Sequence, residues 1–208
     1  MIIKICGLAD PDNIRRISQL HPSIMGFIFY APSPRNACAL LPSIVNALPE
    51  DIQRAGVFVD APVSHIIHTA SRYGLHSVQL HGKETPDMCK SLKNSGLKVM
   101  KAIGVDNDID WEMLKPYEGS IDMFVLDTLT AIHGGSGRKF DWKLLQNYTL
   151  ATPYLLSGGI GPDDTEAITY ASGRLPLMAG VDINSRFEIS PGVKNPQLIA
   201  NFINSIKA

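Results

Sequence analysis

The stretch Ile2-Ile3-Lys4-Ile5-Cys6-Gly7-Leu8 decides the fold of this chain, together with its later counterpart Met123-Phe124-Val125-Leu126-Asp127. In each stretch a short apolar run ends in a residue that can carry chemistry, a thiol in one case and a carboxylate in the other. Runs that are apolar at nearly every position predict strands buried on both faces, as in a parallel sheet covered by helices. A thiol and a carboxylate at strand ends are a base and an acid suited to proton transfer.

Apolar runs of this kind recur along the whole chain and alternate strictly with longer polar or amphipathic segments. Such alternation predicts parallel strands joined by right-handed helical crossovers. Eight strand–helix pairs are the number that closes into a (β/α)8 TIM barrel, and an open doubly wound sheet is the main alternative. The predicted strands are 2–5, 24–29, 54–59, 77–80, 98–103, 122–126, 153–156 and 176–181, and the predicted helices are 11–20, 36–47, 62–73, 84–95, 109–116, 141–147, 162–171 and 195–206.

Prolines mark several of the predicted helix starts. Pro11, Pro86 and Pro162 stand at or near a first helical position, where the missing N–H group costs nothing. Pro42 falls inside the predicted helix 36–47, so that helix should begin late or be kinked.

The composition indicates an ordinary globular protein. Of the 208 residues, 45% are hydrophobic and 19% are charged, and the chain has neither a long linker nor a low-complexity tract, so we predict one catalytic domain over residues 1–208. The net charge of −1 offers no basic field for nucleic acid and no polybasic segment for a membrane. A phosphorylated small molecule is still an acceptable ligand, because backbone amides can bind phosphate without a net positive charge.

The N-terminus and the cysteines predict a cytoplasmic location. No apolar stretch approaches the roughly 18 residues of a membrane span, and the chain enters a strand without the pattern of a secretory signal. The cysteines Cys6, Cys38 and Cys89 are odd in number and widely spaced, which argues against a disulfide framework and against a metal site of the C-x-x-C type.

Polar or glycine-rich steps follow nearly every predicted strand. Active sites of (β/α)8 barrels form from these loops at the C-terminal ends of the strands, and a phosphate site commonly lies after the last two strands. Glycines there let backbone N–H groups approach a phosphate, and a short extra helix starting near Asn184 would add its dipole. The site residues predicted in this way are Cys6, Arg35, His81, Asp127, Gly158, Gly159, Asp182, Asn184 and Ser185.

Each of these residues also has an ordinary structural interpretation. A cysteine near an apolar strand is usually a small buried hydrophobe, which suits Cys38 and Cys89 within their predicted helices. Cys6 differs because it lies just past its strand, and its thiol pKa, ordinarily about 8.5, would need lowering by Lys4 or by a positively charged intermediate. Asp127 can equally be a helix cap, Arg35 a solvated surface charge and His81 a packing residue. Segment 129–138, rich in glycine, is the longest irregular stretch and is predicted to be a mobile loop over the site.

A series of short motifs runs along the chain in a specific order: Lys4-Ile5-Cys6-Gly7-Leu8, Gly26-Phe27-Ile28-Phe29, Ser33-Pro34-Arg35, Gly56-Val57-Phe58-Val59, Val78-Gln79-Leu80-His81-Gly82, Leu126-Asp127-Thr128, Gly134-Gly135-Ser136-Gly137, Phe140-Asp141-Trp142, Leu156-Ser157-Gly158-Gly159, Gly180-Val181-Asp182, Glu188 and Pro191-Gly192. Their order and spacing resemble the phosphoribosylanthranilate isomerase family, barrel enzymes of tryptophan biosynthesis, over the whole length of the chain.

The resemblance implies a specific reaction. It is an Amadori rearrangement of N-(5-phosphoribosyl)anthranilate to the 1-deoxyribulose 5-phosphate product, with no cofactor and no metal. Asp127 is implied to be the general acid that opens the furanose ring, and Cys6 the general base that takes the C2 proton. Arg35 is the implied partner of the anthranilate carboxylate, and Gly158, Gly159 and segment 182–185 form the implied phosphate cradle.

Two positions depart from the family pattern. Ser136 stands where the family generally has threonine, and Arg186 stands where it generally has glycine, which raises the question whether Arg186 contacts the phosphate or faces solvent. The alternatives are a non-catalytic sugar-phosphate-binding barrel and another cofactor-free sugar-phosphate isomerase. The sequence leaves the choice between a monomer and a homodimer open.

Overall fold

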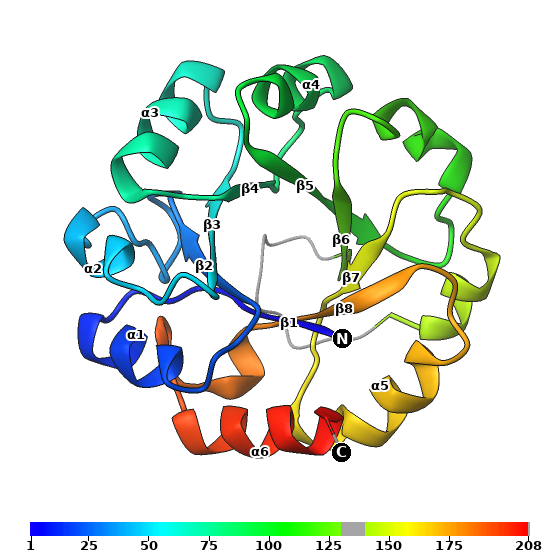
Figure 1. Ribbon diagram of the computed structural model, residues 1–208. Coiled ribbons are helices and arrows are strands. Elements are labelled where there is room, and N and C mark those ends of the chain that lie inside the picture. Colours follow the sequence, from blue (N-terminus) through cyan, green and yellow to red (C-terminus); the bar gives the residue numbers. More distant parts are fainter. Residues whose placement is uncertain (130–139, 208) are drawn as a thin grey trace.

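The protein folds into a closed barrel of eight parallel strands, as seen down the barrel axis in the computed structural model (Figure 1). The structure describes residues 1–129 and 140–207. The predicted (β/α)8 fold is confirmed, with β1 to β8 paired in chain order and β8 closing onto β1. The strands are β1 Ile2–Ile5, β2 Ile24–Ile28, β3 Gln53–Phe58, β4 Ser77–Leu80, β5 Lys98–Val105, β6 Met123–Thr128, β7 Tyr154–Leu156 and β8 Met178–Ile183.

The outer ring contains fewer regular α-helices than the sequence predicts. The helices are α1 Pro11–Ser18, α2 Pro42–Asn46, α3 Val63–Tyr73, α4 Pro86–Asn94, α5 Thr165–Ser172 and α6 Pro196–Lys207, with 3-10 helices η1 Trp111–Tyr117, η2 Trp142–Asn147, η3 Pro162–Asp164 and η4 Ser185–Phe187. The predictions of regular helices at 109–116 and 141–147 are therefore wrong in type, and η1 includes Pro116, which cannot donate a helical hydrogen bond.

The predicted helix 36–47 is also corrected. Only Pro42–Asn46 is helical, because Pro42 takes the first helical position, where its fixed φ is favourable. Cys38 consequently lies in an exposed turn, contrary to the prediction of a buried helical residue, whereas Cys89 is buried in α4. All three cysteines are free thiols.

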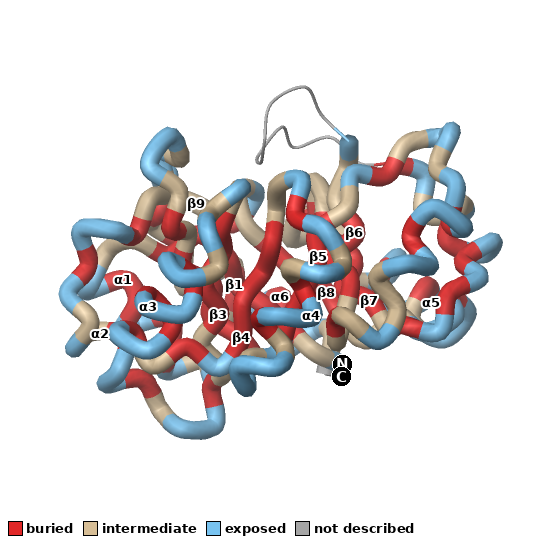
Figure 2. The backbone as a smooth tube through the Cα atoms, turned by 90° about the horizontal axis from the view of Figure 1, so that it is seen from above, coloured by how far each residue is buried: buried red, intermediate tan, exposed pale blue. Residues whose placement is uncertain are grey.

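Buried residues lie along the barrel strands and on the inner sides of the helices (Figure 2), and their apolar side chains form two clusters. The larger cluster lies between the barrel and its helices, and a smaller one fills the barrel interior with Ile24, Ala55, Met100, Ala102, Val125 and Leu155. Successive side chains of a strand point to opposite faces, so these residues identify the interior face of each strand. The interior is therefore a packed core and not a channel.

A two-stranded antiparallel hairpin follows β8 and was not predicted from the sequence. Its strands are β9 Glu188–Ser190 and β10 Val193–Lys194, joined through Gly192, whose φ of +86° favours glycine. In Figure 2 β9 lies at the edge of the barrel opposite the N-terminus, where the strands end. The hairpin thus adds residues to the mouth of the barrel.

Two further observations concern the extent of the structure. The loop predicted to be mobile, 129–138, falls outside the described residues except for Leu129, and so does Ser136. In the described part of the chain, none of the helices combines the length and the hydrophobicity needed to cross a lipid bilayer.

Candidate active site

Cys6 directly follows β1 and is buried, with 4% of its surface exposed. Its backbone N–H donates to the carbonyl of Ile183 at 2.9 Å, which fixes the residue between β1 and β8. Gly26 on β2 provides the space for its side chain, because a Cβ atom there would lie 3.0 Å from Cys6 Sγ. Alternation along the strand places Cys6 on the same face as Lys4, the face that points into the barrel.

Lys4 and Asp182 form an ion pair beneath Cys6. Lys4 Nζ donates to Asp182 Oδ2 at 2.7 Å, and their side chains are 0% and 5% exposed. Burial opposes ionisation of Lys4, but the adjacent Asp182 carboxylate raises its pKa overall, so the lysine is charged. Burial also opposes ionisation of the Cys6 thiol and so raises its pKa, and the Lys4 and Lys194 charges oppose that increase.

Asp127 lies near the C-terminal end of β6, and its half-buried side chain is 22% exposed. Burial raises its pKa from 3.8 to about 6, although the Thr128 N–H, which donates to Asp127 Oδ1 at 2.8 Å, favours the ionised form. Asp182 raises this pKa further and Lys4 lowers it. A carboxyl with a pKa near 6 can give up a proton close to neutral pH, as a general acid must.

Gly158 and Gly159 follow β7 and pack against Asp127. Their φ angles of +85° and +66° lie in the left-handed region that favours glycine. A Cβ atom at Gly158 would collide with Thr128 and lie 2.9 Å from Asp127 Oδ1. The glycine pair therefore brings backbone directly against the carboxyl, and an alanine at position 158 would displace it.

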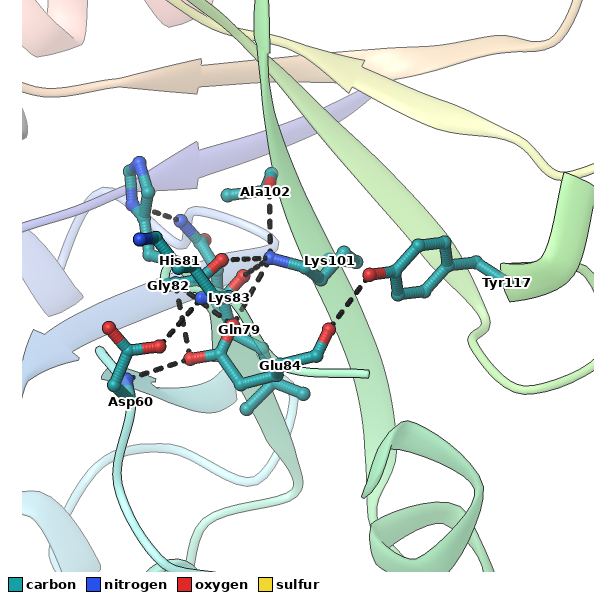
Figure 3. Close-up of polar contacts among 10 residues, drawn as sticks. Asp60, Gln79, His81, Gly82, Lys83, Glu84, Lys101, Ala102 and Tyr117 are labelled. Atoms are coloured by element: carbon teal, nitrogen blue, oxygen red, sulfur yellow. Dashed lines mark hydrogen bonds and ion pairs between the residues drawn. The ribbon is translucent and has the colours of Figure 1, made fainter. Parts of the chain in front are cut away.

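His81 follows β4 and faces the same carboxyl. Its Nε2 atom lies 4.0 Å from Asp127 Oδ2. Its Nδ1 atom lies 3.5 Å from Gln79 Nε2, a contact drawn in Figure 3. When the Gln79 amide donates to Nδ1, the proton of the neutral imidazole is on Nε2 and points toward Asp127. His81 is thus placed to contact Asp127 or a ligand bound beside it.

A second buried ion pair holds the loop that carries His81 (Figure 3). Lys101 Nζ donates to Glu84 Oε2 at 3.1 Å and to the carbonyl oxygens of Leu80 and Gly82 at 3.2 and 2.8 Å. The Glu84 carboxylate also accepts the N–H groups of Gly82 and, across from β3, Asp60. The backbone on both sides of His81 is therefore fixed by charged groups that do not themselves face the site.

Arg35 lies in the loop after β2 and is paired with Glu188 of the hairpin. Arg35 Nε and Nη2 donate to the two Glu188 oxygens at 2.9 and 2.8 Å, a bidentate geometry. Gly7, next to Cys6, allows this side chain to pass, because a Cβ atom there would lie 2.8 Å from both Arg35 Cδ and Asn184 Oδ1. The Arg35 side chain therefore packs against Gly7, the residue that follows Cys6.

The loop after β8 differs in detail from its prediction. Asn184 Oδ1 accepts a hydrogen bond from Lys194 Nζ at 2.6 Å, and Ser185 begins η4, a single 3-10 turn. The predicted extra helix is therefore too short to supply a helix dipole. Asp182 lies inside β8 rather than after it, and its Oδ2 is taken by Lys4. Arg186 is exposed.

The structure brings most of the predicted residues to one end of the barrel. The side chains of Arg35 and Asn184 meet at Gly7, which follows Cys6. Asp127 lies against Gly158 and faces His81. Sequence reasoning missed the roles of Glu84, Lys101 and Lys194. The available signal was a lysine within an apolar strand, as in Lys98-Val99-Met100-Lys101-Ala102, since a buried lysine requires a partner.

Comparison with known proteins gives a consistent result. The family model described as N-(5'phosphoribosyl)anthranilate (PRA) isomerase matches residues 3–205. A protein of Parabacteroides distasonis named N-(5'-phosphoribosyl)anthranilate isomerase is 41% identical over 208 residues, which cover 99% of this chain and 93% of that protein.

Solved structures agree with the sequence comparison. The crystal structure of phosphoribosyl anthranilate isomerase from Thermotoga maritima superposes with a TM-score of 0.87 at 33% identity, covering 100% of this chain and 99% of the other. A crystal structure of the isomerase in complex with reduced 1-(o-carboxyphenylamino)-1-deoxyribulose 5-phosphate has a TM-score of 0.82 at 30% identity, with coverages of 100% and 99%.

Proposed function

This chain belongs to the N-(5'-phosphoribosyl)anthranilate isomerase family, and from that premise we propose that it isomerises N-(5'-phosphoribosyl)anthranilate with Asp127 as general acid and Cys6 as general base. The reaction is the Amadori rearrangement to 1-(2-carboxyphenylamino)-1-deoxyribulose 5-phosphate, a step of tryptophan biosynthesis. The observation that supports the assignment is a half-buried carboxyl with a raised pKa and a buried thiol at the C-terminal ends of β6 and β1.

Ring opening is the first step. Asp127 in its protonated form transfers its proton to the furanose ring oxygen, the C1–O bond breaks, and the anthranilate nitrogen lone pair forms an iminium ion. The pKa of about 6 keeps a useful fraction of Asp127 protonated near neutral pH while leaving it acidic enough to transfer the proton. His81 Nε2 lies 4.0 Å from Asp127 Oδ2, and in the tautomer that carries the proton on Nε2 its N–H group would stabilise the carboxylate left behind.

Proton removal at C2 is the second step. The iminium withdraws electrons from C1, so the C2–H bond becomes acidic enough for a thiolate of moderate basicity. Cys6 takes this proton, the electron pair moves to neutralise the iminium, and the resulting enolamine tautomerises to the ketone. Lys4 and Lys194 favour the thiolate form that this step needs, because their charges lower the pKa that burial raises.

Substrate binding follows from the same placement. Arg35 is assigned to the anthranilate carboxylate, and the backbone N–H groups of Gly158, Gly159, Asn184 and Ser185 to the phosphate. The substrate contact predicted for Asp182 stays a prediction. Its carboxylate is bound to Lys4 and would repel a phosphate. The cytoplasmic location, the absence of nucleic-acid and membrane partners, the single domain, and the choice between monomer and homodimer also stay predictions.

The test is a fluorescence assay of the purified protein with freshly generated phosphoribosylanthranilate, without metal and with chelator. Wild type should remove the fluorescent substrate faster than its spontaneous decay, and Cys6→Ser and Asp127→Asn should each nearly abolish this. Full activity in Cys6→Ser would show that the base is assigned wrongly. A folded wild type without activity would favour the non-catalytic binding protein.

A further inference from the structure

We propose that Glu188 and Lys194, on the β9–β10 hairpin, are positioning residues that hold one edge of the Arg35 guanidinium ready for the carboxylate of the substrate. This rests on the proposed function, which assigns Arg35 to that carboxylate. The two residues do not contact the reacting atoms in the proposal. They make the enzyme selective for a carboxylated aryl group over an uncharged one.

One edge of the Arg35 guanidinium binds Glu188, and the other edge can bind a ligand. Its Nε and Nη2 atoms donate to Glu188 at 2.9 and 2.8 Å, which consumes the Nε–Nη2 edge. Two hydrogens on Nη1 and one on Nη2 are left over. Within residues 1–129 and 140–207, no hydrogen bond from Nη1 is found. The Nη1–Nη2 edge has the spacing to bind a second carboxylate in the same bidentate manner.

Glu188 is itself held rigidly. Its Oε1 atom accepts from Lys194 Nζ at 2.8 Å and from the Gly192 N–H at 3.1 Å, in addition to Arg35 Nε. Burial alone would raise the pKa of Glu188, but the bonds from Arg35 and Lys194 lower it, so the carboxylate stays ionised. Its side chain is 6% exposed and that of Arg35 is 12% exposed, so solvent screens this pair little.

Lys194 anchors the arrangement to the rest of the fold. Its side chain is fully buried, and its backbone N–H and carbonyl bind the side chain of Asn13 on α1 at 2.8 and 2.7 Å. Its Nζ atom also donates to Asn184 Oδ1 at 2.6 Å. One buried ammonium therefore connects the carboxylate-binding arginine to the loop assigned to the phosphate, and sets their separation.

The cluster holds one carboxylate for two basic groups. Arg35 and Lys194 share Glu188, and although burial lowers the pKa of Lys194, the Glu188 carboxylate opposes that decrease. A carboxylate that arrives at the Nη1–Nη2 edge gives Arg35 a second acidic partner. If Glu188 did not hold the Arg35 side chain, that side chain would lose conformational freedom when the ligand binds. The entropy cost would weaken affinity for the carboxylate.

The experiment compares two ligands on two proteins. The ligands are reduced 1-(o-carboxyphenylamino)-1-deoxyribulose 5-phosphate and its phenylamino counterpart without the carboxylate. Dissociation constants are measured by calorimetry for the full chain and for Glu188→Gln, with Glu166→Gln on the exposed surface of α5 as the matched control. Glu188→Gln should weaken the carboxylated ligand about tenfold and the other ligand by less than about twofold. With the substrate, KM should rise by a similar factor and kcat should change little.

Two outcomes would overturn the proposal. Equal weakening of both ligands would mean that Glu188 only maintains the local structure, and unchanged affinity for both would mean that Arg35 does not depend on it. Because Glu188→Gln leaves Lys194 with a weaker partner, Glu188→Asp serves as a second variant. It keeps the charge with a shorter reach and should show a smaller loss with the same selectivity for the carboxylated ligand; a loss without that selectivity would count against the proposal.

The parent protein separates this proposal from the proposed function. If the parent protein isomerises its substrate and prefers the carboxylated ligand, but Glu188→Gln preserves that preference, only the positioning role fails. If the parent protein shows no preference between the ligands and Arg35→Met changes neither affinity, the assignment of Arg35 to the carboxylate fails first.

Discussion

Lys4 and Lys101 are both buried in barrel strands and both pair with a carboxylate, yet they serve the site differently. Lys4 on β1 faces the barrel interior, on the same face as Cys6, and its charge acts on the thiol directly. Lys101 on β5 lies between Met100 and Ala102, which fill the interior, so it faces the surrounding helices. It acts on the site only through the backbone around His81.

The difference shows that the face of the strand on which a buried lysine lies decides the effect of its charge. A lysine that shares the interior face with the catalytic groups changes their pKa values, whereas a lysine on the opposite face fixes geometry. The partners differ as well. Asp182 has Lys4 as its one described partner, and its Oδ1 atom is buried without a hydrogen bond in the described structure. Glu84 additionally accepts backbone N–H groups from two loops.

The largest expected effect is the loss of kcat when Asp127 or Cys6, whose pKa values Lys4 lowers, is replaced. Asp127→Asn and Cys6→Ser should each lower kcat by about 10²- to 10⁴-fold, because each removes one proton-transfer group. Steady-state kinetics with ligand-binding measurements checks this. Affinity for the reduced product analogue should change little, and a parallel loss of affinity would indicate damaged structure instead.

The two ion pairs should differ in how they respond to replacement. Lys4→Met and Lys101→Met should each lower the free energy of unfolding by about 3–5 kcal/mol, since each leaves a buried carboxylate unpaired. Adding Asp182→Leu should restore most of the loss in the first case. Adding Glu84→Leu should not restore it in the second, because the N–H groups of Asp60 and Gly82 lose their acceptor.

Urea unfolding of the four variants and the parent protein measures these differences. Equal recovery in both double variants would contradict the view that Glu84 holds two loops while Asp182 pairs with one lysine.

Asp127 should make the protein less stable as pH rises. Its pKa is about 6 in the folded protein and ordinarily 3.8, so its contribution is fully present below pH 3.8 and is lost as pH rises through 6. The loss amounts to at most about 3 kcal/mol. Asp127→Asn should therefore be stabilised relative to the parent protein at pH 8 but not at pH 4, as measured by urea unfolding at both values. A stability difference that does not vary with pH would contradict the raised pKa.

The smallest expected effect is a shift in the pH dependence of kcat/KM, which should occur on replacing Lys4 but not Lys101. Lys4 lowers the pKa of both Cys6 and Asp127, so Lys4→Met should move both limbs of the kcat/KM profile to higher pH. Activity at pH 7 should fall by up to about tenfold for each unit by which the pKa of Cys6 rises more than that of Asp127, and the deficit should narrow at alkaline pH. Lys101→Met should leave both limbs in place, and a matching shift there would remove the distinction between the lysines.

Much of the fold was predictable because its strands are buried on both faces. Short continuous apolar runs such as Met123-Phe124-Val125-Leu126 identify strands with little competition, and all eight were found in the structure. The surrounding segments were harder. Segment 111–117 has a helix-like composition but forms a 3-10 helix, and the hairpin 188–194 is too short and polar to give a periodic signal.

The sequence by itself determined the number and order of the strands, and hence the end of the barrel at which Cys6, Asp127 and the Gly158-Gly159 pair lie. It did so because alternation and strand ends are local properties of the chain. Only the tertiary structure decided the charge partners, since Lys4 meets Asp182 across 178 positions and Arg35 meets Glu188 across 153. Barrel closure and the folding back of the hairpin bring these residues together, and the pKa of Asp127 depends on the burial that results.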